Sequence, residues 1–250
     1  MRTILLLSLT IFSGIAAAEE VKNLAEVALL PPYCSGTQQI RAISKDPKPI
    51  EEYIAIYGKP YSHLHHYCWT LNAENNSWRI RDKVLRESKL DYELGGIKYV
   101  LDRSDPGFVL LPEIYNTQAR ILFTLRRDPE AVAALYKAIA AKPDYVPTYL
   151  RLSDYFVDKG NKTNAIKILE QGIDHTEKAD ALIKKLAKLG KTYDGVPGGK
   201  RKNGDPPQEA APSTPQAQTE ISEEKTHAPT TVPAQSAEQA EKGPFCRFCP

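Results

Sequence analysis

Small and large apolar residues return at the same offsets in two stretches of this chain, residues 115–143 and 149–177. The matched positions are separated by 34 residues, and they are Tyr115 and Tyr149, Ala119 and Ser153, Leu122 and Phe156, Ala131 and Ala165, Leu135 and Leu169, and Ala138 and Gly172. A period of this length is typical of a repeating pair of antiparallel helices. Small residues let the paired helices approach, and large residues fill the space between them. The sequence therefore predicts stacked helical pairs, an architecture that more often binds other chains than performs chemistry.

The stretch before these repeats contains a divergent third pair. Apolar residues at i, i+3, i+4 and i+7 predict a helix from about residue 61 to residue 75, and they are Leu64, Tyr67, Cys68 and Leu71. A longer helix is expected over residues 79–102. A last helix over residues 178–189, with Gly190 as its C-cap, would cover the exposed end of the stack. Residues 61–194 are therefore expected to form a helical repeat domain.

Residues 19–60 are expected to form a short N-terminal helical segment. One apolar stripe runs from Val21 to Ala28 and ends before a pair of prolines, which cannot continue a helix. A second brief helix is predicted over residues 50–57, followed by Gly58 and Pro60. The segment has little core of its own.

Residues 1–18 have the pattern of a cleaved secretory signal peptide. Arg2 supplies the positive charge, Ile4 to Ile15 the apolar core, and three alanines the small residues before the cleavage point at Glu19. The apolar run is too short to span a bilayer. We therefore expect an exported protein with no stable membrane insertion after cleavage.

From residue 195 onward the composition shifts to proline, alanine, glutamine and glutamate, with few apolar side chains. Such a segment cannot bury enough apolar surface to offset the entropy of ordering it. Residues 195–250 are therefore expected to be a disordered tether. The tether ends in the motif Cys246-Arg247-Phe248-Cys249.

The charge balance argues against nucleic-acid binding. Without the leader the chain has 32 basic and 31 acidic residues, whereas nucleic-acid-binding proteins carry a concentrated positive charge. The sequence shows no glycine-rich phosphate loop, nucleophile elbow, zinc-protease helix or acidic pair. We therefore predict no enzymatic activity and no cofactor.

The two repeats resemble the tetratricopeptide repeat family, with units at about residues 112–145 and 146–178 and a divergent unit at about 61–108. The usual Leu-Gly pair of the first helix is replaced by Gln118-Ala119 and Leu152-Ser153. The resemblance implies an all-α superhelix whose concave surface binds a peptide or protein segment. The sequence Leu-His-His-Tyr-Cys-Trp at residues 64–69, followed by Leu-Leu-Pro-Glu-Ile at residues 110–114 and the repeats, also resembles secreted repeat proteins of Gram-negative bacteria. This resemblance suggests a periplasmic location and a partner in the cell envelope.

The family's concave positions fall on polar and apolar residues of the first helices. Carried over to this sequence, they are Asn116, Arg120, Phe123, Leu150, Asp154 and Val157, and by a weaker alignment His65, Trp69 and Asn72. This set would hold a partner through hydrogen bonds and apolar anchors. The family's lysine-rich clamp for a terminal carboxylate is not reproduced. The alternative is that these residues only form a solvated helix face.

Four cysteines in an exported protein meet an oxidising compartment. Sequence separation favours the disulfides Cys34–Cys68 and Cys246–Cys249 among three possible pairings. The first would close a loop of about 35 residues, contribute about 4 kcal/mol, and pin the N-terminal segment to the first repeat.

The terminal Cys246 and Cys249 leave a second function open, that of a thiol-redox or metal-handling protein. His63 and His66, three residues apart, are the histidines that could assist a metal. Ordinary packing of these histidines is the simpler interpretation, and no metal site is predicted. A third possibility is a structural subunit of an envelope complex.

Overall fold

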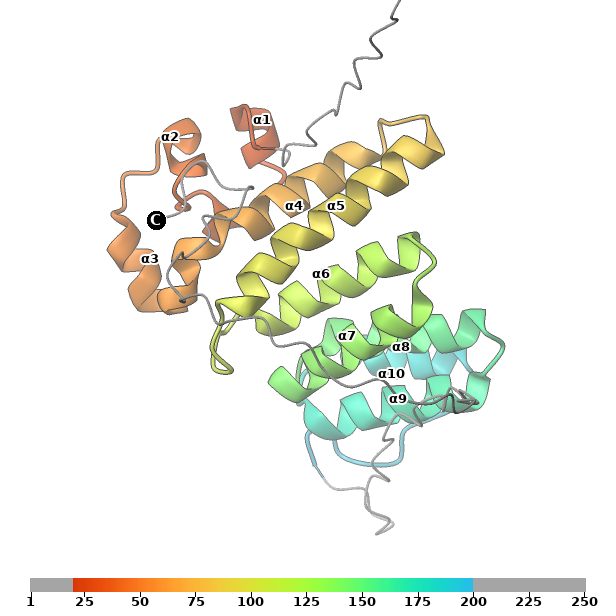
Figure 1. Cartoon of the computed structure of the whole chain (residues 1–250). Coiled ribbons are helices and arrows are strands. Elements are labelled where there is room, and N and C mark those ends of the chain that lie inside the picture. Colours follow the sequence, from red (N-terminus) through yellow and green to blue (C-terminus); the bar gives the residue numbers. More distant parts are fainter. Residues whose placement is uncertain (1–19, 200–250) are drawn as a thin grey trace, which may run out of the picture. The chain divides into compact units, whose positions relative to one another are not determined.

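A computed structural model describes residues 20–199 of the chain, and these residues contain α-helices and short 3₁₀ helices without a strand (Figure 1). In chain order the elements are α1 (Leu24–Val27), η1 (Pro32–Cys34), α2 (Ile40–Ser44), α3 (Ile50–Tyr57), η2 (Lys59–His63), α4 (His65–Ser77), α5 (Lys83–Asp102), α6 (Leu111–Thr124), α7 (Asp128–Ala141), α8 (Val146–Asp158), α9 (Lys162–His175) and α10 (Asp180–Lys188). The predicted all-α fold resembling tetratricopeptide repeats is confirmed.

Three helical pairs and one final helix follow one another along the chain. Helix α4 packs on α5, α6 on α7, and α8 on α9, while α10 packs on α9 and α8 (Figure 1). The helix expected over residues 61–75 begins as the 3₁₀ helix η2, which has Pro60 in its first turn. Helix α5 starts only at Lys83, because the Asp82 side chain accepts a hydrogen bond from the Leu85 amide at 3.0 Å and caps it. Helix α2 was not predicted, since five residues are too few to show a helical period.

The close approach within the pairs depends on their smallest residues. A methyl group added to Gly172 of α9 would lie 2.6 Å from the Tyr149 ring of α8, which is too close for any side chain. Ala138 and Ala165, which also occupy small positions of the repeat, are fully buried. The apolar residues around them form one core through α6, α7, α8, α9 and α10. The pattern of small and large residues therefore has the packing role that the sequence predicted.

The repeat extends to the backbone of the turn inside each pair. Arg126 and Gly160, which are 34 positions apart, both have left-handed φ values, 61° and 70°. The next amide closes the same hydrogen bond in both turns, from Arg127 to the Leu122 carbonyl at 2.9 Å and from Asn161 to the Phe156 carbonyl at 2.8 Å. Glycine adopts this conformation freely, whereas an arginine there costs about 1 kcal/mol.

The N-terminal segment is fastened to α4 and its 3₁₀ turn. Cys34 and Cys68 form the predicted disulfide, and both are fully buried. The Tyr61 hydroxyl donates to the Tyr33 carbonyl at 2.6 Å, and the Tyr61 ring stacks on Tyr53 of α3. One covalent bond and several polar contacts therefore hold a segment that lacks a core of its own.

Several predictions about the chain ends lie outside the described residues. These are the signal peptide over residues 1–18, most of the predicted disordered tail over residues 195–250, and the Cys246–Cys249 pairing. The boundaries of the predicted regions therefore stay predictions. Among residues 20–199, no helix combines the length and the apolar character needed to cross a membrane.

We expect the double substitution Cys34→Ala with Cys68→Ala to lower the free energy of unfolding by about 4 kcal/mol. The disulfide joins residues 34 positions apart, and its loss restores the loop entropy of the unfolded chain. Denaturant unfolding of the oxidised wild type and the double variant measures the difference. Amide exchange should rise first in η1 and α2 while α8 and α9 stay protected; equal unfolding midpoints for the two proteins would contradict this role.

Candidate partner-binding face

The first helices of the pairs, α4, α6 and α8, follow one another with α10 as the next in line. We call the side of these helices that carries the predicted partner-binding residues the first-helix face. Its polar members are Glu74, Glu113, Asn116, Arg120, Arg151, Asp154 and Lys185. Most of them touch a residue of a neighbouring first helix rather than standing alone in solvent.

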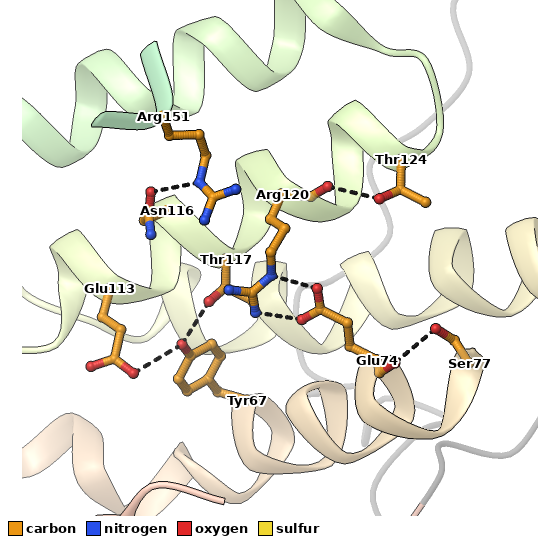
Figure 2. A network of polar contacts seen from close by, with 9 residues as sticks. All are labelled: Tyr67, Glu74, Ser77, Glu113, Asn116, Thr117, Arg120, Thr124 and Arg151. Atoms are coloured by element: carbon orange, nitrogen blue, oxygen red, sulfur yellow. Dashed lines mark hydrogen bonds and ion pairs between the residues drawn. The ribbon is translucent and has the colours of Figure 1, made fainter. Parts of the chain in front are cut away.

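Glu74 of α4 and Arg120 of α6 form a two-pronged ion pair, as Figure 2 shows. The Arg120 Nε and Nη2 atoms donate to the two carboxylate oxygens of Glu74, each at 2.5 Å. The Glu74 side chain is only 13% exposed. The hydrogen bond to Glu74 raises the pKa of Arg120. Arg120 lies on the predicted face, but its charge is already matched inside the molecule.

Two further contacts continue this row across α8 and α10. The Arg151 Nε atom of α8 donates to the Asn116 side-chain oxygen of α6 at 3.1 Å (Figure 2). Lys185 of α10 forms an ion pair with Asp154 of α8. Each neighbouring pair of first helices is therefore joined by at least one polar bridge. Three predicted partner-binding residues, Asn116, Arg120 and Asp154, are members of these bridges.

A buried group of hydroxyls lies beside the first bridge. The hydroxyl of Tyr67 on α4 lies 2.9 Å from the Thr117 hydroxyl and 3.4 Å from the Glu113 carboxylate, both on α6 (Figure 2). Tyr33 of the N-terminal segment donates to the same Glu113 carboxylate. Burial raises the pKa of both tyrosines, so their hydroxyls stay protonated and act as donors. This group ties three segments together.

His65 and Trp69 are core residues, and the expectation that they extend an open partner-binding surface is wrong. Each is 1% exposed. The indole N–H of Trp69 donates to the Gln39 side chain at 2.6 Å, and His65 packs edge-on against the Trp69 ring. Asn72, on the same side of α4, donates to Glu26 at 3.2 Å. The N-terminal segment covers this part of α4, a contact that the repeat pattern cannot reveal.

The predicted apolar anchors have separate surroundings on α6 and α8. Phe123 stacks on Tyr155 with ring centroids 5.3 Å apart. Leu150 is partly buried against the core, and Val157 is 40% exposed. Phe123 and Tyr155 are both partly exposed. A partner can therefore reach an aromatic pair near the second bridge.

Arg151 was missed by the sequence analysis, although it follows Leu150 directly. Its guanidinium is half-buried, and within residues 20–199 its one hydrogen-bond partner is the neutral Asn116 side chain. Burial, followed by the positive charge of Arg120, lowers the pKa of Arg151. Figure 2 shows both guanidinium groups over α6. Arg151 is one residue, and so one 100° helical step, away from the predicted site residue Leu150. Its position next to Leu150 was the only signal in the sequence, because a single arginine gives no periodic pattern.

A hollow of about 690 Å³ lies elsewhere, between α5, α6 and α7. Five of its six charged lining residues are paired: Lys98 contacts Asp102 at 2.6 Å, and Arg127 contacts Asp91 at 2.7 Å and Glu130 at 2.6 Å. The sixth, Lys137, lies 5.9 Å from the centroid of the Tyr115 ring. Because three carboxylates balance three cations, the lining has no net charge that would favour a charged ligand. The first-helix face is the better candidate site.

The histidines of α4 and its preceding turn pack against aromatic rings. His66 lies 4.0 Å from Tyr99 and His63 lies 5.7 Å from the same ring, measured between ring centroids. Burial lowers the pKa of His65 to about 4 and that of His66 to about 3. Within residues 20–199 no three histidine, cysteine, aspartate or glutamate side chains gather as metal ligands.

Residues 146–178 match the tetratricopeptide repeat family. The matched span contains α8 and α9 and coincides with the second unit that the sequence predicted. No curated protein and no solved structure matches the chain. Tetratricopeptide repeats are typically units for protein–protein interaction rather than enzymes, and the match indicates such a module here.

We expect Arg120→Ala to lower the free energy of unfolding by about 2 kcal/mol, because it leaves the mostly buried Glu74 carboxylate without its partner. The double variant Glu74→Ala with Arg120→Ala should lose less than the sum of the two single variants. Denaturant unfolding of the four proteins gives the coupling energy. Strictly additive losses would show that the pair contributes nothing to joining α4 to α6.

We expect acid to destabilise the fold through His66. Its pKa falls from 6.5 in the unfolded chain to about 3 in the folded protein. The unfolded state therefore binds more protons, and this part of the stability, complete above pH 6.5, is lost as the pH falls toward about 3. At about pH 4.5 the loss is about 3 kcal/mol.

The measurement compares wild type with His66→Gln, which cannot titrate, by denaturant unfolding at about pH 7 and about pH 4.5. Buried Glu93, whose pKa burial raises to about 7, acts in the opposite sense but is present in both proteins. The variant should lose less stability than wild type between the two pH values, whereas exposed His175→Gln should behave as wild type. Identical losses for all three proteins would refute the assignment to His66.

Proposed function

We propose that this chain is a protein-interaction module that holds an acidic segment of a partner protein on the first-helix face of α6 and α8. Arg151 is the charged contact, and the Phe123–Tyr155 ring pair is the neighbouring apolar contact. The observation that carries the proposal is a half-buried guanidinium whose one hydrogen-bond partner within residues 20–199 is a neutral amide.

A half-buried cation without a carboxylate is costly, because burial disfavours its charged form. Arg120 adds positive charge on the same face, although Glu74 balances most of it. A carboxylate arriving from a partner would offset the burial cost of Arg151 and could accept two parallel hydrogen bonds from its guanidinium. An acidic side chain therefore fits this position better than a neutral or basic one.

The surroundings of Arg151 add apolar contact area. Phe123 and Tyr155 form a partly exposed stacked pair, and Val157 lies on the same helix as Tyr155. Aromatic residues next to an arginine are typical of positions that dominate binding energy at protein interfaces. The favoured partner segment thus combines an acidic residue with a large apolar residue.

We further propose that the partner is met in an oxidising compartment of the cell envelope, as the leader pattern of residues 1–18 suggested. The Cys34–Cys68 disulfide supports this location, because disulfides persist in exported proteins and are rare in reducing compartments. Cell fractionation of the full chain, with detection in the periplasmic and cytoplasmic fractions, tests it.

We expect the full chain to retain immobilised acidic peptides that contain leucine and phenylalanine, and to retain matched glutamine or lysine peptides weakly. Arg151→Gln should weaken acidic-peptide binding about tenfold, because one charge-assisted contact is lost. Fluorescence anisotropy with labelled peptides gives the dissociation constants.

Lys184→Gln on the exposed side of α10 is the matched control and should bind as wild type. Circular dichroism should show that Arg151→Gln stays folded, since the substitution removes one hydrogen bond to the neutral Asn116 side chain. Equal affinity for acidic and glutamine peptides, or no effect of Arg151→Gln, would rule out the proposed contact.

A further inference from the structure

The turn that joins α4 to α5 exposes large apolar side chains. Val84 is 76% exposed and Trp78 is 71% exposed, the two highest values among the large apolar residues of the described chain. Leu85, next to Val84, is 60% exposed. We call residues 78–86 the α4–α5 tip. Single exposed apolar residues are ordinary, but three within one short turn form a patch that calls for a partner.

The same turn is strongly basic. It contains Arg79, Arg81, Lys83 and Arg86 against the single acid Asp82, whose carboxylate is occupied in capping α5. Lys83 forms an ion pair with Glu87 at 3.8 Å. Arg79 and Arg81 are exposed, and neither makes an ion pair within residues 20–199. Arg86 donates to the Ile80 carbonyl at 3.2 Å, which ties the turn together. Apolar and cationic side chains therefore alternate over one projecting turn.

The tip stands at the outer end of the first helical pair (Figure 1). Leu29, which is exposed and follows α1, lies beside the last turn of α4, where its carbonyl accepts from Asn75 at 3.4 Å. A projecting turn can touch a flat surface without being enclosed by it.

We propose that the α4–α5 tip binds the surface of an anionic lipid bilayer. Trp78, Val84 and Leu85 enter the headgroup region, where tryptophan is favoured because its ring is apolar and its N–H is polar. Arg79 and Arg81 contact lipid phosphates. This is peripheral binding, and it does not depend on the peptide-binding function proposed above.

The chemistry of the tip accounts for both parts of such binding. Apolar side chains can insert only if they are exposed on a part of the protein that reaches the bilayer. The tip meets both conditions. Each cation close to an anionic leaflet strengthens binding about fivefold, and this gain is screened by salt. Binding should therefore require anionic lipid and should weaken as salt is raised.

The two tryptophans of the chain make a direct test possible. Trp69 is buried, so the Trp78 indole is the one that can respond to a membrane. The full chain is mixed with vesicles of phosphatidylglycerol and phosphatidylcholine in about equal parts. The expected result is a blue shift of emission and quenching by brominated lipid. Vesicles of phosphatidylcholine alone should produce neither, and a missing response to the anionic vesicles would overturn the proposal.

Variants assign the binding to the tip. Arg79→Gln with Arg81→Gln should weaken vesicle co-sedimentation about tenfold or more. The matched control is Lys184→Gln with Lys188→Gln on α10, both exposed. Val84→Asn should weaken binding, whereas Ile56→Asn, at a residue of similar exposure on α3, should not. Because all these side chains are exposed, circular dichroism should show unchanged folding.

Three further outcomes would overturn the proposal. The first is an equal loss of binding in the tip variants and their controls. The second is loss of vesicle binding only when Lys200, Arg201 and Lys202 are replaced by glutamine, which would assign the contact to that basic cluster. The third is that the wild-type chain does not bind vesicles while the tip variants lose affinity for a protein partner. This result would identify the tip as a protein interface.

Discussion

The close approach of α8 and α9 at Gly172 is the constraint on which the repeat geometry depends. A side chain at Gly172 would collide with the Tyr149 ring at 2.6 Å, so only glycine allows this spacing. Ala138 takes the equivalent place in α7, 34 residues earlier. Because each pair closes tightly around its core, successive first helices lie near enough for their polar side chains to meet. The polar bridges on the first-helix face therefore depend on how tightly the opposite side of each first helix packs against the second helix of its pair.

The protein uses much of its expected binding surface for its own cohesion. Glu74 and Arg120 join α4 to α6, and Asp154 and Lys185 join α8 to α10. Around Trp69 the N-terminal segment already covers α4, held there by the Cys34–Cys68 disulfide. What remains for a partner is the region between α6 and α8. There the bridge is formed by a cation and a neutral amide, so no carboxylate hydrogen-bonds the cation, although Glu74 and Asp154 attract it from a distance.

The sequence predicted the features that are periodic or that depend on neighbouring residues. The 34-residue period identified α6 to α9, and sequence separation favoured the Cys34–Cys68 pairing. The sequence did not predict contacts between segments that are far apart in the chain. The Glu74–Arg120 pair spans 46 residues, and the contact of Trp69 with Gln39 involves a segment that has no repeat. A helix period shows which residues face away from the partner helix of a pair, but not whether another segment then covers them.

Charge placement separates the two surfaces proposed for partners from the hollow between α5, α6 and α7. On α5 and α7, Lys98, Arg127 and their carboxylate partners neutralise one another around the hollow between these helices. Within residues 20–199 the Arg151 guanidinium hydrogen-bonds only the Asn116 amide, with Glu74 and Asp154 acting on it from a distance, and Arg79 and Arg81 form no ion pair. Burial makes the first of these cations selective for a single carboxylate in a fixed geometry, because desolvation must be repaid by directed hydrogen bonds. Exposure makes the other two suited to a diffuse anionic surface, where position matters less than total charge. The two proposed sites thus use the same residue type for different ligands, a peptide at Arg151 and a bilayer at Arg79 and Arg81.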